Sequence, residues 1–406
     1  MATLRPFRAL RPRPDVASRV AAVPYDVVTT EEARAQADDN PLSFLRVSRP
    51  ELELSPDTDP YSDEVYERAA RNFERLKHTA LVLEDEPSVY FYRLRSGNHE
   101  QTGLAACYSL DEYDRGIIKK HERTRRDKED DRTRHMIALG AQTGPVFLVY
   151  RGSGTVDEIA ARVMSREPLF DFEAADRVRH TLWVVGGAMR ETLVAAFAGV
   201  PSLYIADGHH RAASAARARQ EIPLPQARLD EADPTTFLAV AFPHEEARIL
   251  PYNRIVKDLG PLATVDFLKA VRSRFEVSSG TATPEKRGEM AMYFEGTWYT
   301  LRPRVPPVGS DPIAGLDVSV LQGQLLEPVL KIGDVRTDKR IDFIGGARGT
   351  GELERLVDSG KAAVAFSLFP VSVADLMAVA DAGAIMPPKS TWFEPKLRDG
   401  LLVHLI

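Results

Sequence analysis

The sequence predicts an α/β fold of mixed helices and strands, and three features of the chain predict it. Residues 60–77 carry apolar side chains at the spacing of an amphipathic helix. Residues 88–94 and 101–110 are aromatic and β-branched runs joined by a short polar turn, the pattern of a β-hairpin. A short apolar strand at 201–206 leads directly into Asp207-Gly208 and an alanine-rich helix. Strand and helix patterns therefore alternate along one chain.

The remaining elements follow from local signals. Thr29 or Thr30 is expected to cap a helix that begins at the next glutamates. A highly charged helical stretch is expected at 117–139, and Gly144-Pro145 then precedes a strand. Periodicity predicts further strands at 146–150, 181–185 and 237–242, two short strands within 289–301, and helices at 262–274, 318–330 and 373–382.

Length and charge restrict the class of protein. The chain has 406 residues, enough for one elaborate domain or two packed lobes. Hydrophobic residues make up 44% and charged residues 28%, as in ordinary globular proteins. The formal net charge is -6, which argues against DNA as a partner because nucleic-acid binding needs a basic surface.

No targeting or membrane segment is expected. No apolar run reaches the roughly 18 to 20 residues of a membrane-spanning helix, and the arginine-rich start lacks the apolar core of a secretory signal. Cys107 is the single cysteine, so an internal disulfide and a cysteine-rich zinc site are excluded. We therefore expect a cytoplasmic protein without a membrane partner.

The segment from Asp207 to Arg211 is the strongest candidate for a functional site. Gly208 permits a tight turn after the strand, and the amides that open the next helix then face an anion. Arg211 adds a planar, positively charged guanidinium group. His209 and His210 are expected to contact different partners, because adjacent residues lie on different faces of a helix. The alternative is an aspartate cap followed by two surface histidines.

A second candidate is the charged stretch that begins at His121. On a helix, His121, Arg125 and Arg132 would lie near one face, and Glu122 and Glu129 near another. The functional interpretation makes Glu122 a general base or metal ligand and the arginines phosphate contacts. The alternative is a solvated face of salt bridges.

A third candidate lies near the end of the chain. Lys389-Ser390-Thr391 resembles the end of a phosphate-binding loop, but two prolines stand where glycines would precede it, so it is not a P-loop. Lys389 and Lys396 still offer point charges, and Ser390 and Thr391 offer hydroxyls, to a phosphoryl group. A rigid proline turn with its lysines in solvent is the alternative.

Several blocks of sequence resemble one known family. PYDVV, NPLSFLRVSRPE, HERTR, GPVFL, YIADGHHRAA, LPYNRIVK and MPPKSTWFEPKL occur here in that order, and together they resemble the domain of unknown function 1015 family of bacteria and archaea. That family is itself similar to the ParB/sulfiredoxin superfamily, which includes free serine kinases that use ADP or ATP. The resemblance runs essentially from end to end, and the DGHHR and MPPKST blocks are its most specific parts.

The resemblance implies a fold and a division of the chain. It implies a ParB/sulfiredoxin-like nucleotide-binding core with elaborated N- and C-terminal lobes. The N-terminal lobe would comprise residues 1–100, and the core with the DGHHR turn would comprise residues 101–255. The C-terminal lobe, residues 256–406, would return the MPPKST segment to the ligand-binding cleft at the DGHHR turn. Free serine kinases carry an Asp-Gly-His-x-Arg turn, which Asp207 to Arg211 match. Sulfiredoxins use a cysteine where His209 stands here, so sulfinic acid reduction is not expected.

The leading hypothesis is a kinase-like phosphotransferase that uses ATP or ADP, with Mg²⁺, on free serine or a similar small hydroxyl compound. Alternatives are a non-enzymatic nucleotide-binding ParB-like regulator and a phosphoester hydrolase, and a homodimer is compatible with each. The expected catalytic residues are Glu122, Asp207, His209 and His210. The expected phosphate-binding residues are Gly208, His210, Arg211, Arg125, Lys389, Ser390 and Thr391, and Asp207 is the expected magnesium contact.

Overall fold

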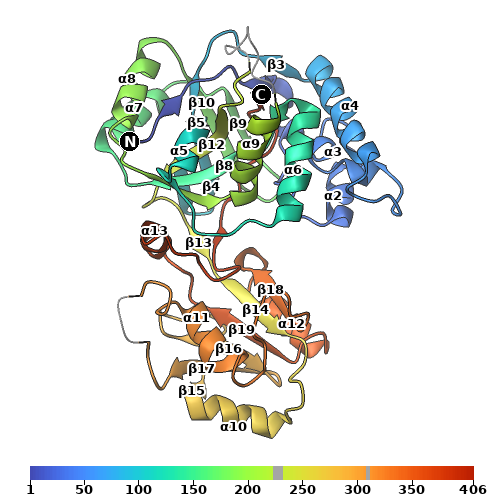
Figure 1. The fold of residues 1–406 in the computed structure, drawn as a ribbon, viewed down its shortest axis with the longest axis vertical. Helices are drawn as coiled ribbons and strands as arrows, with labels where there is room; N and C mark the ends of the chain where they lie inside the picture. The colour runs from blue at the N-terminus through green and yellow to red at the C-terminus, as the bar shows by residue number, and fades with distance from the viewer. Residues whose placement is uncertain (223–231, 308–310) are drawn as a thin grey trace. The chain divides into compact units, whose positions relative to one another are not determined.

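The computed structural model describes residues 1–222, 232–307 and 311–406, and it divides the chain into two compact units (Figure 1). Unit 1 comprises Met1–Ala247 and Pro395–Ile406, and unit 2 comprises Arg248–Glu394. Both units mix helices with sheets, which confirms the α/β class expected from the sequence. Within the described ranges, no helix has the length and apolar character needed to cross a membrane.

Unit 1 is built on a nine-stranded mixed sheet. Its strands run in the spatial order β6-β11-β8-β12-β5-β4-β10-β9, with β1 also paired to β5. The strands are β1 (Leu4–Arg5), β4 (Val89–Ser96), β5 (His99–Ser109), β6 (Ile118–Lys119), β8 (Val146–Tyr150), β9 (Phe170–Glu173), β10 (Arg179–Val185), β11 (Leu203–Asp207) and β12 (Thr236–Pro243). Pairing is parallel for β6 with β11 and for β8 with β12, and antiparallel elsewhere along this order.

The predicted hairpin is confirmed, and it joins two regions expected to be separate lobes. β4 and β5 pair from Tyr90 with Ala105 to Ser96 with His99, and the turn between them carries Gly97 at φ 58°. β5 continues the same sheet by pairing with β12. The lobes expected at 1–100 and 101–255 therefore share one sheet in unit 1, and the division that the structure shows lies elsewhere.

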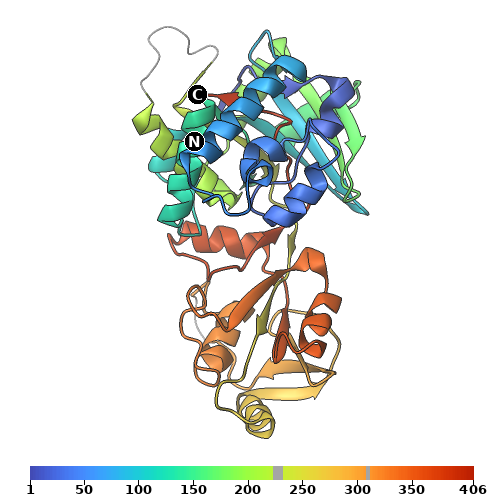
Figure 2. The same cartoon turned by 90° about the vertical axis from the view of Figure 1, so that its right-hand side faces the viewer.

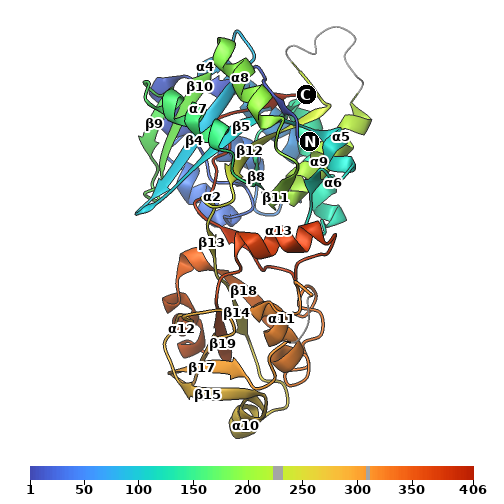
Figure 3. The same ribbon diagram turned by 90° about the vertical axis from the view of Figure 1, so that its left-hand side faces the viewer.

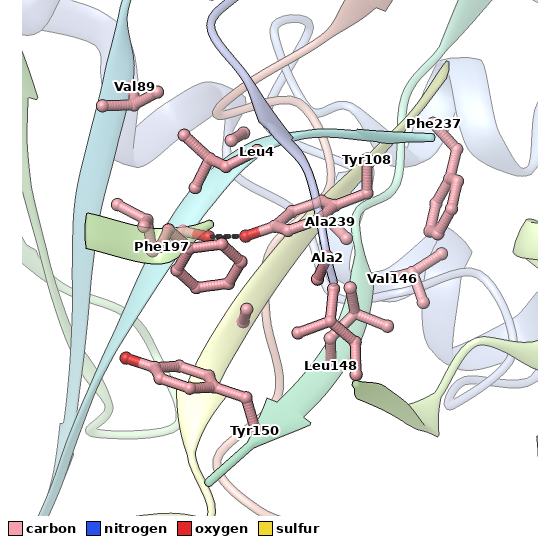
Figure 4. Packing of buried hydrophobic residues seen from close by; sticks show 14 of the residues in the cluster. Ala2, Leu4, Val89, Tyr108, Val146, Leu148, Tyr150, Phe197, Phe237 and Ala239 are labelled. Atoms are coloured by element: carbon pink, nitrogen blue, oxygen red, sulfur yellow. Dashed lines mark hydrogen bonds between the residues drawn. The ribbon is translucent and has the colours of Figure 1, made fainter. Parts of the chain in front are cut away.

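Among the described residues of unit 1, two of its hydrophobic clusters show how helices pack in this unit. The first lies between the sheet and α7 and α8, and in it Phe197 packs edge-on against Tyr108 and Tyr150, with ring centroids 6.1 and 5.3 Å apart (Figure 4). Ala2 and Leu4 of the N-terminal strand belong to the same core. The second core gathers α2, α3 and α4 around Phe44 and Phe73. The helices of unit 1 are α1 (Ala17–Val20), α2 (Thr30–Ala37), α3 (Leu45–Ser48), α4 (Asp63–Thr79), α5 (Leu110–Asp114), α6 (Arg126–Leu139), α7 (Gly154–Met164), α8 (Gly187–Phe197) and α9 (His209–Glu221).

The last residues of the chain are part of unit 1. Figure 2 shows the red C-terminal strand beside blue N-terminal elements. β21 (His404–Leu405) pairs with β7 (Ala141–Gln142), while Val403 bridges to Leu10 and Asp399 bridges to Ala22. A further small sheet joins β2 (Leu10–Pro12) with β3 (Leu81–Leu83). The C-terminal segment thus brings Lys396 and Asp399 into unit 1.

Unit 2 is built on a six-stranded antiparallel sheet with the order β15-β17-β16-β19-β14-β18. Figure 3 shows α10 lying along β15. The strands are β13 (Ile249–Leu250), β14 (Tyr252–Val256), β15 (Phe275–Ser279), β16 (Met290–Phe294), β17 (Thr297–Pro303), β18 (Ile341–Gly345), β19 (Val364–Leu368) and β20 (Trp392–Phe393), and β13 and β20 form a separate two-stranded sheet. The helices are α10 (Thr264–Arg274), α11 (Asp317–Leu321), α12 (Gly351–Asp358) and α13 (Val373–Asp381).

Two expected helices differ from the prediction. The helix expected at 117–139 begins only at Arg126, because residues 118–119 pair with β11 as β6 and residues 120–125 form the connection. The predicted helical faces that grouped His121 with Arg125, and Glu122 with Glu129, are therefore wrong. The helix expected at 318–330 is short: α11 passes into one π-helical turn at Gln322–Leu326.

Candidate functional site

One edge of the sheet of unit 1 collects the candidate residues. β6 and β11 are parallel, so their carboxyl ends meet at the same edge, where His121 follows β6 and Asp207 ends β11. β8 is antiparallel to β11, so its beginning, at Gly144-Pro145, lies at that edge as well. Ligands of α/β proteins commonly bind beyond the carboxyl ends of strands. The topology thus places three of the sequence blocks side by side.

Gly208 makes the turn from β11 into α9. Its φ of 92° and ψ of 29° lie in the left-handed region, where a residue with a Cβ atom is strained. Among the residues that the structure describes, no side chain caps the start of the helix by a hydrogen bond. Since the first amides of an α-helix have no partner within the helix and carry its positive end, this start is suited to an anion.

Arg211 lies one turn into α9, and its side chain is only 7% exposed. Its Nη1 donates to the Pro145 carbonyl at 2.6 Å, and its Nη2 lies 3.4 Å from Asp26 Oδ1. Although burial alone would lower the pKa of this guanidinium, Asp26 and Asp207 hold it above its ordinary value. Arg211 is therefore a fixed cation at the sheet edge.

Asp207 forms an ion pair with Lys396. The Lys396 Nζ lies 2.7 Å from Asp207 Oδ2, and the exposed fractions of the two side chains are 13% and 31%. Burial tends to raise the pKa of Asp207, but Lys396 and Arg211 outweigh it and hold that pKa below the ordinary value. Asp207 is thus a carboxylate at neutral pH, as a metal or substrate contact would require.

His209 is buried beside His121. The two rings meet edge to face with centroids 4.4 Å apart, and the His121 amide donates to His209 Nε2 at 3.4 Å. Burial lowers the pKa of His209 well below its ordinary value and that of His121 to about 4. His209 is therefore neutral with its proton on Nδ1, which lies 3.7 Å from Glu122 Oε2.

His210 has a different partner, as expected for adjacent positions on a helix. Its Nε2 accepts a hydrogen bond from the Arg125 amide at 3.0 Å. The Arg125 guanidinium pairs with Asp127 at 2.7 Å and is largely exposed. Arg125 thus meets the turn through its backbone, and the phosphate contact predicted for its side chain stays a prediction.

The structure adds residues that the sequence analysis did not single out. Asp26, 41% exposed, pairs with Arg211, and Tyr25 stacks on the Arg132 guanidinium 4.3 Å from its ring centre. Asp399 is 2% exposed and lies against Gly144. The available signal was membership of the PYDVV block for Tyr25 and Asp26, whereas Asp399 follows the MPPKSTWFEPKL block by two residues. These residues are far from the DGHHR block in the sequence, so the sequence alone did not show that the fold brings them together.

Lys389, Ser390 and Thr391 lie in unit 2. The Arg254 guanidinium donates to the carbonyls of Pro388 and Lys389, at 3.3 and 3.1 Å, and so fixes the turn. Lys389 has a positive φ of 56°, and the Ser390 hydroxyl donates to the Pro387 carbonyl at 2.6 Å. The return of this turn to the DGHHR segment remains a prediction, as do the phosphate-binding roles of its residues.

A metal site made by protein ligands alone is not found. Over residues 1–222, 232–307 and 311–406, no three His, Cys, Asp or Glu side chains are grouped so that they could hold an ion. Any magnesium at Asp207 would take most of its ligands from phosphate oxygens and water, which is common for this ion.

The family model described as "Protein of unknown function (DUF1015)" matches residues 4–319. The match includes the PYDVV, HERTR, GPVFL and DGHHR blocks of unit 1. No curated protein matches the chain.

Solved structures give only a weak likeness. A conserved hypothetical protein from Pyrococcus furiosus is 14% identical, with 75% of this chain and 95% of that chain covered and a TM-score of 0.36. A free serine kinase in complex with AMP is 13% identical, with 74% and 92% covered and a TM-score of 0.37. SbnI with a C-terminal truncation, from Staphylococcus aureus, is 12% identical, with 74% and 87% covered and a TM-score of 0.38. At such TM-scores the likeness carries no argument about chemistry.

Proposed function

The chain belongs to the family described as Protein of unknown function (DUF1015), and we propose that it is a kinase-like phosphotransferase. In this proposal, the terminal phosphates of ATP or ADP bind at the start of α9, and the acceptor is free serine or a similar small hydroxyl compound. The observation that carries the proposal is an uncapped helix start with two fixed cations, Arg211 and Lys396, beside it.

The binding step follows from the charges at this turn. The first amides of α9 and the Arg211 fork supply directional donors for phosphate oxygens. Lys396 supplies a third positive group, which is 13% exposed and now neutralises Asp207. A phosphate competes with Asp207 and Asp26 for these two cations, so binding would loosen both ion pairs.

Glu122 is the proposed general base for the acceptor hydroxyl. Its side chain is 41% exposed and lies 3.7 Å from the ring of neutral His209. In the proposed step, the hydroxyl proton moves to a Glu122 carboxylate oxygen while the hydroxyl oxygen attacks the terminal phosphorus. The bond from that phosphorus to the bridging oxygen breaks, and the oxygen leaves with its electron pair on ADP, if ATP is the donor, or on AMP, if ADP is the donor. His209, fixed by the His121 amide, would orient Glu122, and His210 would contact the phosphate.

Magnesium is proposed to enter with the nucleotide. Asp207 fits such an ion because it is ionised, 31% exposed and adjacent to the helix start. When bound, the ion supplies neutralisation of charge across the phosphates. The ParB-like nature of the core, the choice between ATP and ADP, a cytoplasmic location and a homodimer stay predictions.

The decisive experiment combines the protein with Mg²⁺, ATP or ADP, and a panel of amino acids, sugars and small alcohols, with ³¹P NMR detection of new phosphate esters. We expect at least one pairing to give product. In the Arg211→Lys variant, kcat/KM should fall by about a hundredfold or more, because the planar fork is lost while the charge remains. Arg219→Lys is the matched control: Arg219 lies on the same helix but pairs with Asp111 and Asp114.

Each of the other outcomes would point to a different function for this protein. Release of inorganic phosphate without any acceptor would indicate the hydrolase. Saturable nucleotide binding without turnover would indicate the non-enzymatic regulator. If neither nucleotide binds with or without Mg²⁺, or if R219K loses as much activity as R211K, the proposed phosphate site is wrong.

A further inference from the structure

Asp399 is a buried acid with an unsatisfied oxygen. The residue is 2% exposed, and its Oδ1 is buried without a hydrogen-bond partner among the residues that the structure describes. Its backbone is fixed on one side by the bridge to Ala22. On another side Gly144 leaves it room: a Cβ atom there would stand 2.6 Å from Asp399 Oδ1. A buried polar atom with no partner is costly, so this arrangement calls for an explanation.

Arg211 carries a complementary unsatisfied atom. Its Nε is buried and has no hydrogen-bond partner in the described part of the chain, whereas its Nη1 donates to Pro145, next to Gly144. An unpaired acceptor on Asp399 and an unpaired donor on Arg211 therefore both adjoin the segment that opens β8. Each group affects the ionisation of the other.

The charge of Asp399 is finely balanced by its surroundings. The charged and titratable groups that act on it are Arg211 of α9, Arg132 of α6, Asp26 of the loop before α2 and Arg398 of its own segment, and Tyr92 of β4 is coupled to it as well. Burial raises the pKa of Asp399 and Asp26 adds to the rise, while Arg211, Arg132 and Arg398 oppose it, which leaves the pKa at about 7. A modest change in local charge therefore decides whether this carboxyl is ionised.

We propose that Asp399 is a positioning residue that acts through Arg211, taking up one proton when a phosphate binds at the start of α9. This inference rests on the proposed function, and it adds that the ligand is captured together with a proton. The proton passes from solvent to the Asp399 carboxylate, which becomes a neutral acid, and no covalent bond of the ligand changes.

The direction of the coupling follows from Coulomb's law. A phosphate dianion beside Arg211 adds negative charge near Asp399 and competes for the cation that favours its ionised form. Protonation of Asp399 removes its electrostatic attraction for Arg211 and one charge that would repel the ligand. Affinity is then highest below about pH 7 and weakens by up to about tenfold per pH unit above it.

Calorimetry of ADP binding near pH 8, in buffers that differ in ionisation enthalpy, measures the proton uptake directly. The ADP phosphates are fully ionised at this pH, since their last pKa is about 6. We expect the full-length protein to take up between about half a proton and one proton per ADP. The Asp399→Asn variant, which keeps the shape of the neutral acid, should bind ADP without uptake and with an affinity almost independent of pH.

Glu112→Gln is the matched control. Glu112 is a buried carboxyl of unit 1 too, but its oxygens accept hydrogen bonds from Thr3. E112Q should keep the uptake even if it is less stable. Uptake that is absent in the wild type, or unchanged in D399N, would overturn the proposal.

A ligand-free measurement separates this inference from the proposed function. In the folded protein the acid stays protonated up to about pH 7, and in the unfolded chain only up to about pH 4. The midpoint of thermal unfolding of the wild type minus that of D399N should therefore decrease as pH rises from about 4 to 7, then level off. A flat difference refutes the assignment to Asp399. Failure of ADP to bind, with this slope intact, refutes the nucleotide site instead.

Discussion

Lys396 shows how one residue near the end of the chain controls the charge of the turn. Its ammonium is 2.7 Å from Asp207, and both side chains are less than a third exposed. Lys396→Met should lower the free energy of unfolding by about 1–3 kcal/mol, less than a fully buried pair because water still reaches Asp207. Urea unfolding followed by circular dichroism measures the loss.

The loss should depend on pH in a definite direction. Burial opposes ionisation of Asp207, but Lys396 and Arg211 depress its pKa in the folded state. The stability from this pair is therefore complete above the unfolded pKa of about 4, and it disappears as pH falls through the folded pKa. The difference between wild type and K396M should shrink below about pH 4. Lys257→Met, at an exposed pair 3.9 Å from Asp342, should change stability by less than about 0.5 kcal/mol at any pH.

The individual site residues were predictable to different degrees. Asp207 to Arg211 stood out because a glycine and an arginine follow an apolar strand directly. Asp26 and Asp399 did not, because each looks like an ordinary loop acid until the fold brings it beside Arg211 or Gly144. Sequence spacing shows which residues share a local element, and it cannot show which distant loops share a sheet edge.

At the scale of elements, a substitution at the start of α9 tests whether an anion binds there. Gly208→Ala should cost about 1–2 kcal/mol, because φ at this position is 92°. The added Cβ would also lie 3.5 Å from Arg211 Nη1, in ordinary contact. Since any shift of the turn displaces the amides and the guanidinium together, ADP affinity should fall several-fold as well, as isothermal titration calorimetry would show.

Gly116→Ala is the appropriate comparison for this element. Gly116 has φ 73° and no atom within 4 Å of an added Cβ. It should lose similar stability and keep its ADP affinity. Equal loss of affinity in both variants would mean that the effect of G208A reflects general destabilisation. The proposed anion-binding site at the start of α9 would then lose this support.

Elements with a clear period or cap were predicted well. Thr29 caps α2 through a capping box with Glu32, and the predicted strand at 146–150 is β8. The structure of the charged stretch after residue 117 was harder to predict. Ile118 and Lys119 form a two-residue strand that is defined by its pairing with β11 and has no pattern of its own in the sequence. Helix propensity alone favoured one long helix there, and tertiary pairing overrode it.

At the scale of the whole molecule, unit 1 is made of two separate parts of the chain. The final segment supplies buried Leu401, Leu402 and Val403, the β21 strand and the site residues Lys396 and Asp399. Unit 2 has its own cores, and its ends meet: Glu394 donates to the Arg248 carbonyl at 3.1 Å. Unit 2 therefore has the form of an insertion into unit 1, an arrangement hidden from a sequence read in order.

Replacement of residues 248–394 by a short Gly-Ser linker tests this arrangement. We expect unit 1 to fold cooperatively, because the two ends of the removed segment lie within one hydrogen bond and a few residues close such a gap. Circular dichroism and thermal unfolding would check the fold, with deletion of 395–406 as the destabilised comparison. The shortened protein also tests the prediction for Lys389, Ser390 and Thr391. If these residues assist phosphoryl transfer, it should bind ADP through Arg211 yet form no product; full activity would exclude them from the reaction.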